Sequence, residues 1–258
     1  MNNKSNMFLA LYYLLRIKLS YWKQVILLCF PGSRTAIYKI CNEVKALIDE
    51  EGSDLVKTTI IRNWVNQNST HLIDNEHDSY AFDLSKVVVR VWGYRNSLYS
   101  RPHLSCGPRA YLMKEILDRL GFNSRIIDIL EVNKGNPQSH TLLEYYDNEL
   151  SKWIMQDPDF NVFYKSKLSD EALCAKECLQ MNKENISFES SGNQVENLKN
   201  LKETIVDYFC GVVVYRYAYV GKKTIYILAD GAKDYTIKNN MLFKDFCTYI
   251  DNRYIKFN

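Results

Sequence analysis

Cys106 is the residue of this chain whose position is best suited to covalent chemistry. It lies in the segment Ser105-Cys106-Gly107-Pro108, directly before a stretch with helical periodicity. Pro108 suits the first turn of a helix, because the N–H groups of that turn have no intrahelical acceptors. A thiol at a helix N-terminus feels the positive end of the helix dipole and nearby backbone donors, which favour the thiolate. The position therefore predicts a nucleophile.

The helix that would hold this thiol is predicted by its apolar spacing and by its end. Apolar residues recur at intervals of three and four, which places them on one face. Gly121 then follows at the position where a glycine commonly ends a helix. The apolar face consists of Ala110, Met113, Ile116, Leu117 and Leu120.

A histidine and an aspartate follow at positions that topology would bring together. Residues 124–130, 139–146 and 152–158 have the composition of three strands, and the last two are separated by the polar turn 147–149. His140 begins the second of these strands and Asp157 ends the third. Antiparallel neighbours joined by a tight turn place the start of one strand beside the end of the other. His140 and Asp157 should therefore be adjacent, and the imidazole could face the thiol of Cys106.

His103 is the competing candidate for the catalytic base, because it lies three residues before Cys106. A residue so near in sequence would have to fold back across the tight turn. His140 has the strand context and the aspartate, so it is the favoured base on role geometry, and His103 is assigned to the lining of the cleft. Arg101 and Arg109 flank the same turn. They could bind a carboxylate or phosphate of the substrate, or they could be solvated surface arginines.

The order of these motifs resembles the transglutaminase-like superfamily of papain-like Cys-His-Asp enzymes. The resemblance rests on Cys-Gly-x-x-Ala from Cys106, Leu-Gly-Phe from Leu120, His-x-x-x-Glu from His140 and Trp-x-x-x-Asp-Pro from Trp153, with a Trp-Val pair at Trp64 upstream. It covers about residues 54–163. It implies an α+β fold with the cysteine helix packed on an antiparallel sheet. By this resemblance Cys106 is the nucleophile, His140 the general base and acid, and Asp157 the residue that orients His140.

Two departures from the pattern concern the substrate more than the triad. Many relatives have glycine two residues before the nucleophile, where this chain has Leu104, and tryptophan two residues after the histidine, where it has Leu142. The family also needs a second donor beside the Cys106 backbone N–H to complete an oxyanion hole. Upstream candidates for this donor are Trp92, Tyr94 and Asn96, and Trp92 and Tyr94 are also candidates for substrate contact.

The resemblance implies acyl chemistry through a thioester. Cys106 would attack an amide, ester or thioester carbonyl of a small molecule or peptide, and an amine or water would then take the acyl group. The resemblance favours transfer to an amine, and hydrolysis by a cysteine peptidase or amidase is the alternative. A non-catalytic relative that binds a peptide in the same cleft is a third reading. No cofactor is expected.

Composition fits one mixed domain and argues against several other classes. Hydrophobic residues make up 47% of the 258 residues, and the net charge is only +3, so nothing indicates nucleic-acid binding. The seven cysteines are odd in number and irregular in spacing, which indicates a reduced, cytoplasmic protein. Cys174 and Cys178 lie four residues apart without a second cysteine or histidine pair, so no metal site is expected.

The first 33 residues are expected to form an amphipathic helical segment before a single domain over 34–258. Residues 7–15 are apolar, and Arg16, Lys18 and Lys23 follow among further apolar residues. The longest uncharged run is too short to span a bilayer, which needs about 20 residues. The helix could pack on the core or on a partner subunit, and it could also lie on a membrane surface. The oligomeric state is left open.

The remaining elements are predicted from periodicity and turn residues. Helices are expected over 34–51, 54–65, 169–181 and 242–254, and residues 84–92 could be strand or helix. His71 and His77 fall in the polar stretch 66–83 and are expected to be solvated. Residues 182–200 are expected to be a loop. Residues 211–220 and 223–229 predict a hairpin, which could extend the catalytic sheet or cover the cleft as an accessory layer.

Overall fold

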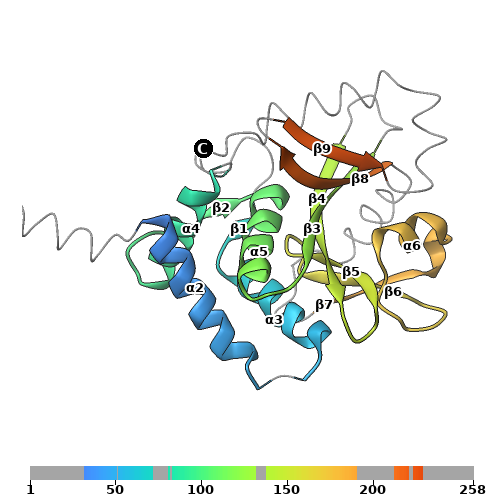
Figure 1. Ribbon diagram of the computed structural model, residues 1–258, viewed down its shortest axis with the longest axis horizontal. Coiled ribbons are helices and arrows are strands. Elements are labelled where there is room, and N and C mark those ends of the chain that lie inside the picture. The colour runs from blue at the N-terminus through green and yellow to red at the C-terminus, as the bar shows by residue number, and fades with distance from the viewer. Residues whose placement is uncertain are drawn as a thin grey trace, which may run out of the picture.

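The computed structural model describes residues 32–50, 52–71, 81, 83–131, 138–190, 212–220 and 223–228 (Figure 1). The helices are α2 (Ser33–Ile48), α3 (Asp54–Gln67), α4 (Leu84–Arg95), α5 (Cys106–Arg119) and α6 (Ala175–Gln180), with a 3-10 turn at Lys183–Asn185. The strands are β1 (Thr70–His71), β2 (His103–Leu104), β3 (Ser124–Glu131), β4 (Gln138–Asp147), β5 (Lys152–Asp157), β6 (Val162–Ser166), β7 (Ile186–Ser190), β8 (Val212–Val220) and β9 (Lys223–Leu228). Three expectations lie outside these residues: the segment before residue 32, His77, and the helix at 242–254.

The large sheet is antiparallel throughout, with strands in the order β7-β6-β5-β4-β3-β8-β9. Helices α2 to α5 gather on one side of it, and α6 lies on the other side (Figure 1). The predicted α+β class is therefore confirmed at the level of a mixed protein with an antiparallel sheet. A separate two-residue parallel pair joins β1 to β2 and ties the end of α3 to the segment before Cys106.

Two apolar clusters lie on the two faces of this sheet, as the two-residue period of a strand requires. Ile126 of β3 packs with α2 to α5, whereas the next residue, Ile127, packs in the cluster that contains Cys178 of α6. The predicted face of α5 is at the centre of the first cluster: Ala110, Met113, Ile116 and Leu117 are all fully buried. Both faces of the central strands are therefore covered, which excludes water from the sheet.

Local signals explain where the helices of the first layer begin and end. The Ser53 hydroxyl accepts a hydrogen bond from the Val56 N–H at 3.3 Å and caps α3. After α5, Gly121 adopts a φ of 90°, and the Phe122 N–H returns to the Leu117 carbonyl at 3.0 Å. This is the hydrogen bond of a Schellman motif, and it confirms the predicted end of the helix.

Residues 84–92, which could have been strand or helix, belong to helix α4. The Asp83 carboxylate accepts a hydrogen bond from the Lys86 N–H at 3.3 Å, which caps the helix. Val87, Val88 and Val91 face the core at helical spacing. A run of β-branched residues is therefore helical here, because the cap and the packing outweigh a small difference in propensity.

Of two expectations for the segment after β6, the helix is confirmed only in part, and the loop is wrong for its described residues. The helix predicted over 169–181 begins only at Ala175, because Ala172 pairs with Lys165 and the Leu173 N–H bonds to the Tyr164 carbonyl at 2.8 Å. Within the loop predicted over 182–200, the described residues 182–190 contain the 3-10 turn and strand β7, which pairs with β6 at the sheet edge, and the rest lies outside the described residues. An edge strand tolerates the polar residues that favoured a loop.

The predicted hairpin is confirmed as β8 and β9, and it extends the large sheet. β8 pairs with β3 from Ile126↔Arg216 to Leu130↔Val212. The register of the hairpin shifts between Arg216 and Ala218, which marks a bulge in β8. Within the part of the chain that the structure describes, no helix has the length and apolar character needed to cross a membrane.

Candidate active site

Cys106 is the first residue of α5 and is half-buried. Ser105 precedes it in an extended conformation without a side-chain cap, so the helix begins abruptly at the thiol. The first N–H groups of a helix lack intrahelical acceptors and point toward its N-terminal end. Negative charge at this position is stabilised by those groups and by the helix dipole.

His140 and Asp157 form a buried hydrogen-bonded pair. The His140 Nε2 atom lies 2.7 Å from Asp157 Oδ2, and the two residues are 4% and 0% exposed. Burial by itself would lower the pKa of His140. The negative charge and hydrogen bond of Asp157, together with the hydrogen bond to Cys106, outweigh burial and raise this pKa well above its usual value. The contacts of His140 therefore favour a protonated imidazole.

The Asp157 carboxylate also orders its own turn. Its Oδ1 atom accepts hydrogen bonds from the N–H groups of Asp159 at 3.0 Å and Phe160 at 3.1 Å. The Tyr164 hydroxyl donates to Oδ2 at 3.0 Å. The Phe160 ring packs against the His140 ring with their centroids 4.9 Å apart. Each oxygen of Asp157 therefore has a fixed direction, which leaves the imidazole little freedom to rotate.

Asp159 is a second buried carboxylate at the site, and sequence reasoning missed it. One carboxylate oxygen, the Cys106 Sγ atom and one ring nitrogen of His140 all lie within 4.8 Å of one another. Asp159 is 3% exposed. Burial would raise its pKa, but the hydrogen bond from His71 and the charges of Arg109, His71 and His140 lower it. Asp159 is therefore held as a carboxylate beside the thiol.

The partners of Asp159 correct two sequence expectations. Arg109 was expected to bind substrate or lie on the surface. It is 2% exposed and its Nη1 atom donates to Asp159 Oδ1 at 3.1 Å, which rules out the surface alternative, whereas substrate contact stays a prediction. His71 was expected to be solvated, but its Nδ1 atom lies 2.7 Å from the same Oδ1 atom. Arg109 is three residues after Cys106 and shares its helix face, a signal that could have pointed to the site. No sequence signal joins His71 to a residue 88 positions away.

The other predicted contact residues have different surroundings. Trp92 is 9% exposed and lies under the Lys39 ammonium of α2, 4.9 Å from its ring centroid. The Asn96 side chain donates to the Trp92 carbonyl at 2.7 Å and helps to end α4. Arg101 is exposed and donates to the Asn66 carbonyl at 3.2 Å. Substrate contact by Trp92 and Arg101, and a role of Asn96 as oxyanion donor, stay predictions.

Tyr94 and His103 are both half-buried, and His103 belongs to β2, where it pairs with Thr70. The nitrogen bonded to Asp157 belongs to His140, so the aspartate orients His140 rather than His103. This geometry supports the choice of His140 as the base over its competitor. A role in substrate contact for Tyr94 and His103 also stays a prediction.

Cys106, His140 and Asp159 are also the one group within the described residues whose donor atoms could hold a metal ion. Thiolate, imidazole and carboxylate are all ligands of Zn²⁺, and Asp157 would support the imidazole from behind. The Cys106 sulfur could not act as a nucleophile while it coordinated a metal ion, so catalysis by the thiol and metal binding would exclude each other. Cys174 and Cys178 are free thiols, and neither belongs to this group.

Comparisons with known proteins do not assign this chain to a family. No family model matches the chain, and no curated protein matches it. A solved structure named "Putative Cysteine Protease" from Cytophaga hutchinsonii is 14% identical with a TM-score of 0.36, over 80% of this chain and 62% of that one. A "putative protease" from Parabacteroides distasonis is 12% identical with a TM-score of 0.31, over 49% and 26%. The chain thus spans less than two thirds of the length of either structure.

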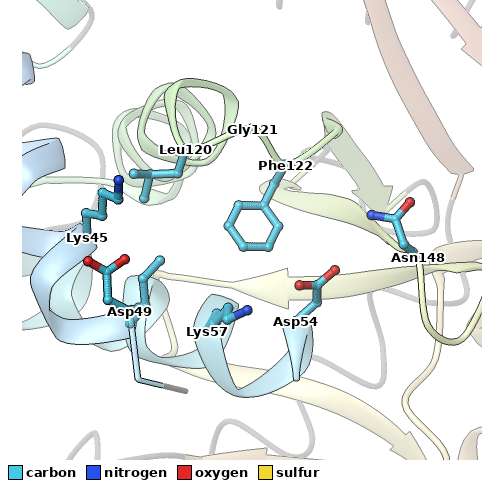
Figure 2. A pocket seen from close by; sticks show the side chains of 9 residues that line it. Lys45, Asp49, Asp54, Lys57, Leu120, Gly121, Phe122 and Asn148 are labelled. Atoms are coloured by element: carbon cyan, nitrogen blue, oxygen red, sulfur yellow. The ribbon is translucent and has the colours of Figure 1, made fainter. Parts of the chain in front are cut away.

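A pocket of about 310 Å³ lies at the opposite end of α5 (Figure 2). Phe122 points into it, with charged side chains of α2 and α3 around its rim (Figure 2). Leu120 and Gly121 line it where α5 ends, whereas Cys106 is the first residue of the same helix. Fourteen helical residues span about 21 Å, so a group bound in this pocket is out of reach of the thiol.

Proposed function

We propose that this protein is a cysteine-dependent enzyme that forms a thioester between Cys106 and the acyl group of its substrate. In this proposal His140 is the general base and acid, and Asp157 orients His140. The observation that supports it most is the placement of His140, which bonds to Asp157 at 2.7 Å and to the thiol of Cys106. A nucleophile, a base and an orienting group in this order are the parts that covalent acyl chemistry requires.

The first half-reaction follows from the charges at the site. The Cys106 thiolate attacks the carbonyl carbon of an amide, and the carbon–nitrogen bond breaks as the tetrahedral intermediate collapses. His140 gives its proton to the departing nitrogen, so the amine leaves neutral. The N–H groups that begin α5 stabilise the transient oxyanion. The products are a free amine, an acyl thioester on Cys106 and a neutral imidazole.

The second half-reaction reverses these roles. An incoming nucleophile attacks the thioester carbon, and the neutral His140 takes its proton. The carbon–sulfur bond then breaks, which restores the thiolate and the imidazolium. We propose a primary amine as the acceptor, as in transglutaminase-like enzymes, with a small-molecule or peptide acyl donor. Water in the same position would give an amidase or peptidase.

The proposal is tested with 4-nitrophenyl acetate as a generic acyl donor, followed by intact-protein and peptide mass spectrometry. The expected result is an acetyl group on Cys106 that is absent in Cys106→Ala and strongly reduced in His140→Ala. Cys178→Ala is the control for removal of a thiol outside the site. Acetylation of Cys106 at the same rate in wild type and His140→Ala would overturn the enzymatic proposal and favour a non-catalytic peptide-binding protein.

The acceptor is decided in the same experiment by adding glycinamide to the acetylated protein. Faster loss of the acetyl group from Cys106 with formation of N-acetylglycinamide supports amine transfer. Loss of the acetyl group as acetate, at a rate independent of the amine, contradicts transfer and supports hydrolysis. Because both outcomes start from the same thioester, the test of the acceptor is separate from the test of the nucleophile.

We propose a reducing compartment such as the cytoplasm. The four cysteines among the described residues, Cys41, Cys106, Cys174 and Cys178, are all free. Contact of the N-terminal segment with a membrane surface stays a separate proposal, motivated by its basic and apolar residues. Co-sedimentation of the full chain with anionic liposomes, compared with a chain lacking residues 1–33, tests it. Equal sedimentation of the two proteins would contradict the membrane contact.

A further inference from the structure

Arg109 joins the helix of the nucleophile to the turn that contains Asp157. Its Nη1 atom donates to Asp159 Oδ1 at 3.1 Å and to the Asp159 carbonyl at 2.9 Å. Its Nη2 atom donates to the Ser69 carbonyl at 2.9 Å. Three separate segments therefore meet at one buried guanidinium: α5, the turn after β5 and the end of α3.

Hydrogen bonds within this turn link Asp159 to Asp157, so a contact at Asp159 also constrains Asp157. The Asp157 Oδ1 atom accepts from the N–H groups of Asp159 and Phe160, which closes the turn on itself. From the other side, the Asn66 side chain donates to the carbonyls of Pro158 and Asp159, both at 3.1 Å. A shift of Asp159 relative to α5 would therefore shift Asp157, and with it His140, relative to Cys106.

Charge gives the same pair a second effect on the thiol. The Asp159 carboxylate lies within 4.8 Å of Cys106 Sγ, and an uncompensated carboxylate at that distance disfavours a thiolate. Arg109 and His71 both contact Asp159 Oδ1 and supply the compensating charge or hydrogen bond. His71 is 39% exposed at its side chain, so Arg109 is the buried and permanently charged partner.

We propose that Arg109 and Asp159 are positioning residues for the thiol chemistry: their buried ion pair sets the placement of the His140–Asp157 pair relative to Cys106. This inference rests on the proposed function and adds two residues that the Cys-His-Asp pattern does not contain. It assigns Arg109 an internal role in place of the substrate contact that its position near the thiol had suggested.

The Arg125–Glu144 pair provides a matched control. Arg125 is also largely buried, and its Nη2 atom lies 2.5 Å from the buried Glu144 carboxylate. Glu144 is four residues from His140 along β4, which separates them by about 13 Å. Replacing Arg125 thus breaks a comparable ion pair between strands β3 and β4 and leaves the turn at Asp157 in place.

The test compares Arg109→Met, Arg109→Lys and Arg125→Met with wild type. The measurement is the rate constant of Cys106 alkylation by iodoacetamide as a function of pH, with melting temperatures recorded for all four proteins. Alkylation is followed well below the lowest melting temperature, and it needs no substrate. In mildly acidic buffer we expect Arg109→Met to slow Cys106 alkylation about tenfold, the effect of one pKa unit on the thiolate fraction.

Arg109→Lys keeps the charge without the planar fork, so we expect an intermediate rate and a smaller loss of melting temperature. It also provides the measurement if Arg109→Met does not fold. Arg125→Met should lower the melting temperature while its alkylation profile stays that of wild type. If Arg109 were purely structural, its variants would behave like Arg125→Met, with a lower melting temperature and an unchanged alkylation rate.

Two different failures are distinguishable. If Cys106 is alkylated no faster than a free thiol in the wild-type protein, the proposed function fails and the positioning role fails with it. If wild-type Cys106 is activated and both Arg109 variants keep the wild-type pH profile despite a lower melting temperature, only the positioning proposal is overturned.

Discussion

Asp157 and Asp159 are separated by a single proline, yet their carboxylates bond to side chains of different elements. Asp157 Oδ2 lies 2.7 Å from His140 Nε2, and Asp159 Oδ1 lies 3.1 Å from Arg109 Nη1. One carboxylate thus contacts the base on the sheet, and the other contacts the helix that begins with the nucleophile. The short turn between them sets the spacing of the two halves, so several properties of the site should depend on it.

The pKa of His140 should report on both of its neighbours. Asp157 is the main group that raises this pKa and Cys106 contributes less, whereas burial lowers it. We therefore expect Asp157→Asn to lower the His140 pKa more than Cys106→Ala does. An NMR titration of the imidazole C–H signals measures both shifts. Cys178→Ala, which removes a buried thiol elsewhere, should leave the His140 titration unchanged, and an unchanged titration in Asp157→Asn would contradict the assignment.

The stability of the fold in acid should depend on Asp159. Its folded pKa is lowered, so the unfolded chain binds a proton on Asp159 more readily than the native protein does. Stability from this group is complete above the unfolded value of about 4 and is lost as pH falls through the folded pKa. Urea unfolding of wild type and Asp159→Asn from neutral pH into acid measures this. The wild-type advantage should shrink as the pH falls, and a constant difference would rule the effect out.

A glycine in α4 provides a test of the segment that leads to Cys106. A Cβ atom at Gly93 would lie 2.0 Å from Cδ2 of Tyr99, whose ring also stacks 4.4 Å from the Arg90 guanidinium. Alanine is favoured over glycine inside a helix by about 0.5–1 kcal/mol. We expect Gly93→Ala to destabilise the wild-type protein, because the Tyr99 ring must leave its site, and to stabilise a Tyr99→Ala background by about that helical preference. Urea unfolding of the double-mutant cycle gives both signs, and equal effects in the two backgrounds would contradict the packing.

Local signals in the sequence were sufficient for the parts of the site that depend on neighbouring residues. The cysteine helix follows from its apolar spacing and from Gly121, which adopts the left-handed conformation expected of it. The adjacency of His140 and Asp157 follows from two strands joined by a short turn, because antiparallel pairing fixes which ends meet. These features need only information within about twenty residues.

The parts that were missed depend on partners far away in sequence. His71 looked solvated because its own neighbours are polar, and only the fold brings it to Asp159. Arg109 looked like a substrate ligand, because a charged residue near a thiol gives no indication of a buried partner 50 positions later. The start of α6 was misplaced although the partner is near in sequence, because the Leu173 N–H bonds to the Tyr164 carbonyl of β6, a contact that the helical spacing does not indicate.

A second buried arginine, Arg62 of α3, should contribute mainly to stability. It is fully buried, and it donates to Gln156 Oε1 at 2.5 Å and to Asn161 Oδ1 at 3.2 Å. Burial lowers its pKa to about 10, with partial compensation by the charge of Asp157, so the guanidinium stays charged at neutral pH.

Replacing Arg62 by methionine would leave two buried amide oxygens without this donor, at about 1–3 kcal/mol for each. We expect Arg62→Met to lower the free energy of unfolding by roughly 2–6 kcal/mol in urea titrations at constant slope. The control is Arg95→Met, which removes an arginine 45% exposed at its side chain from an ion pair with Glu43, and such a surface pair contributes at most about 1 kcal/mol. Similar losses in the two variants would mean that Arg62 is not the buried anchor that its contacts indicate.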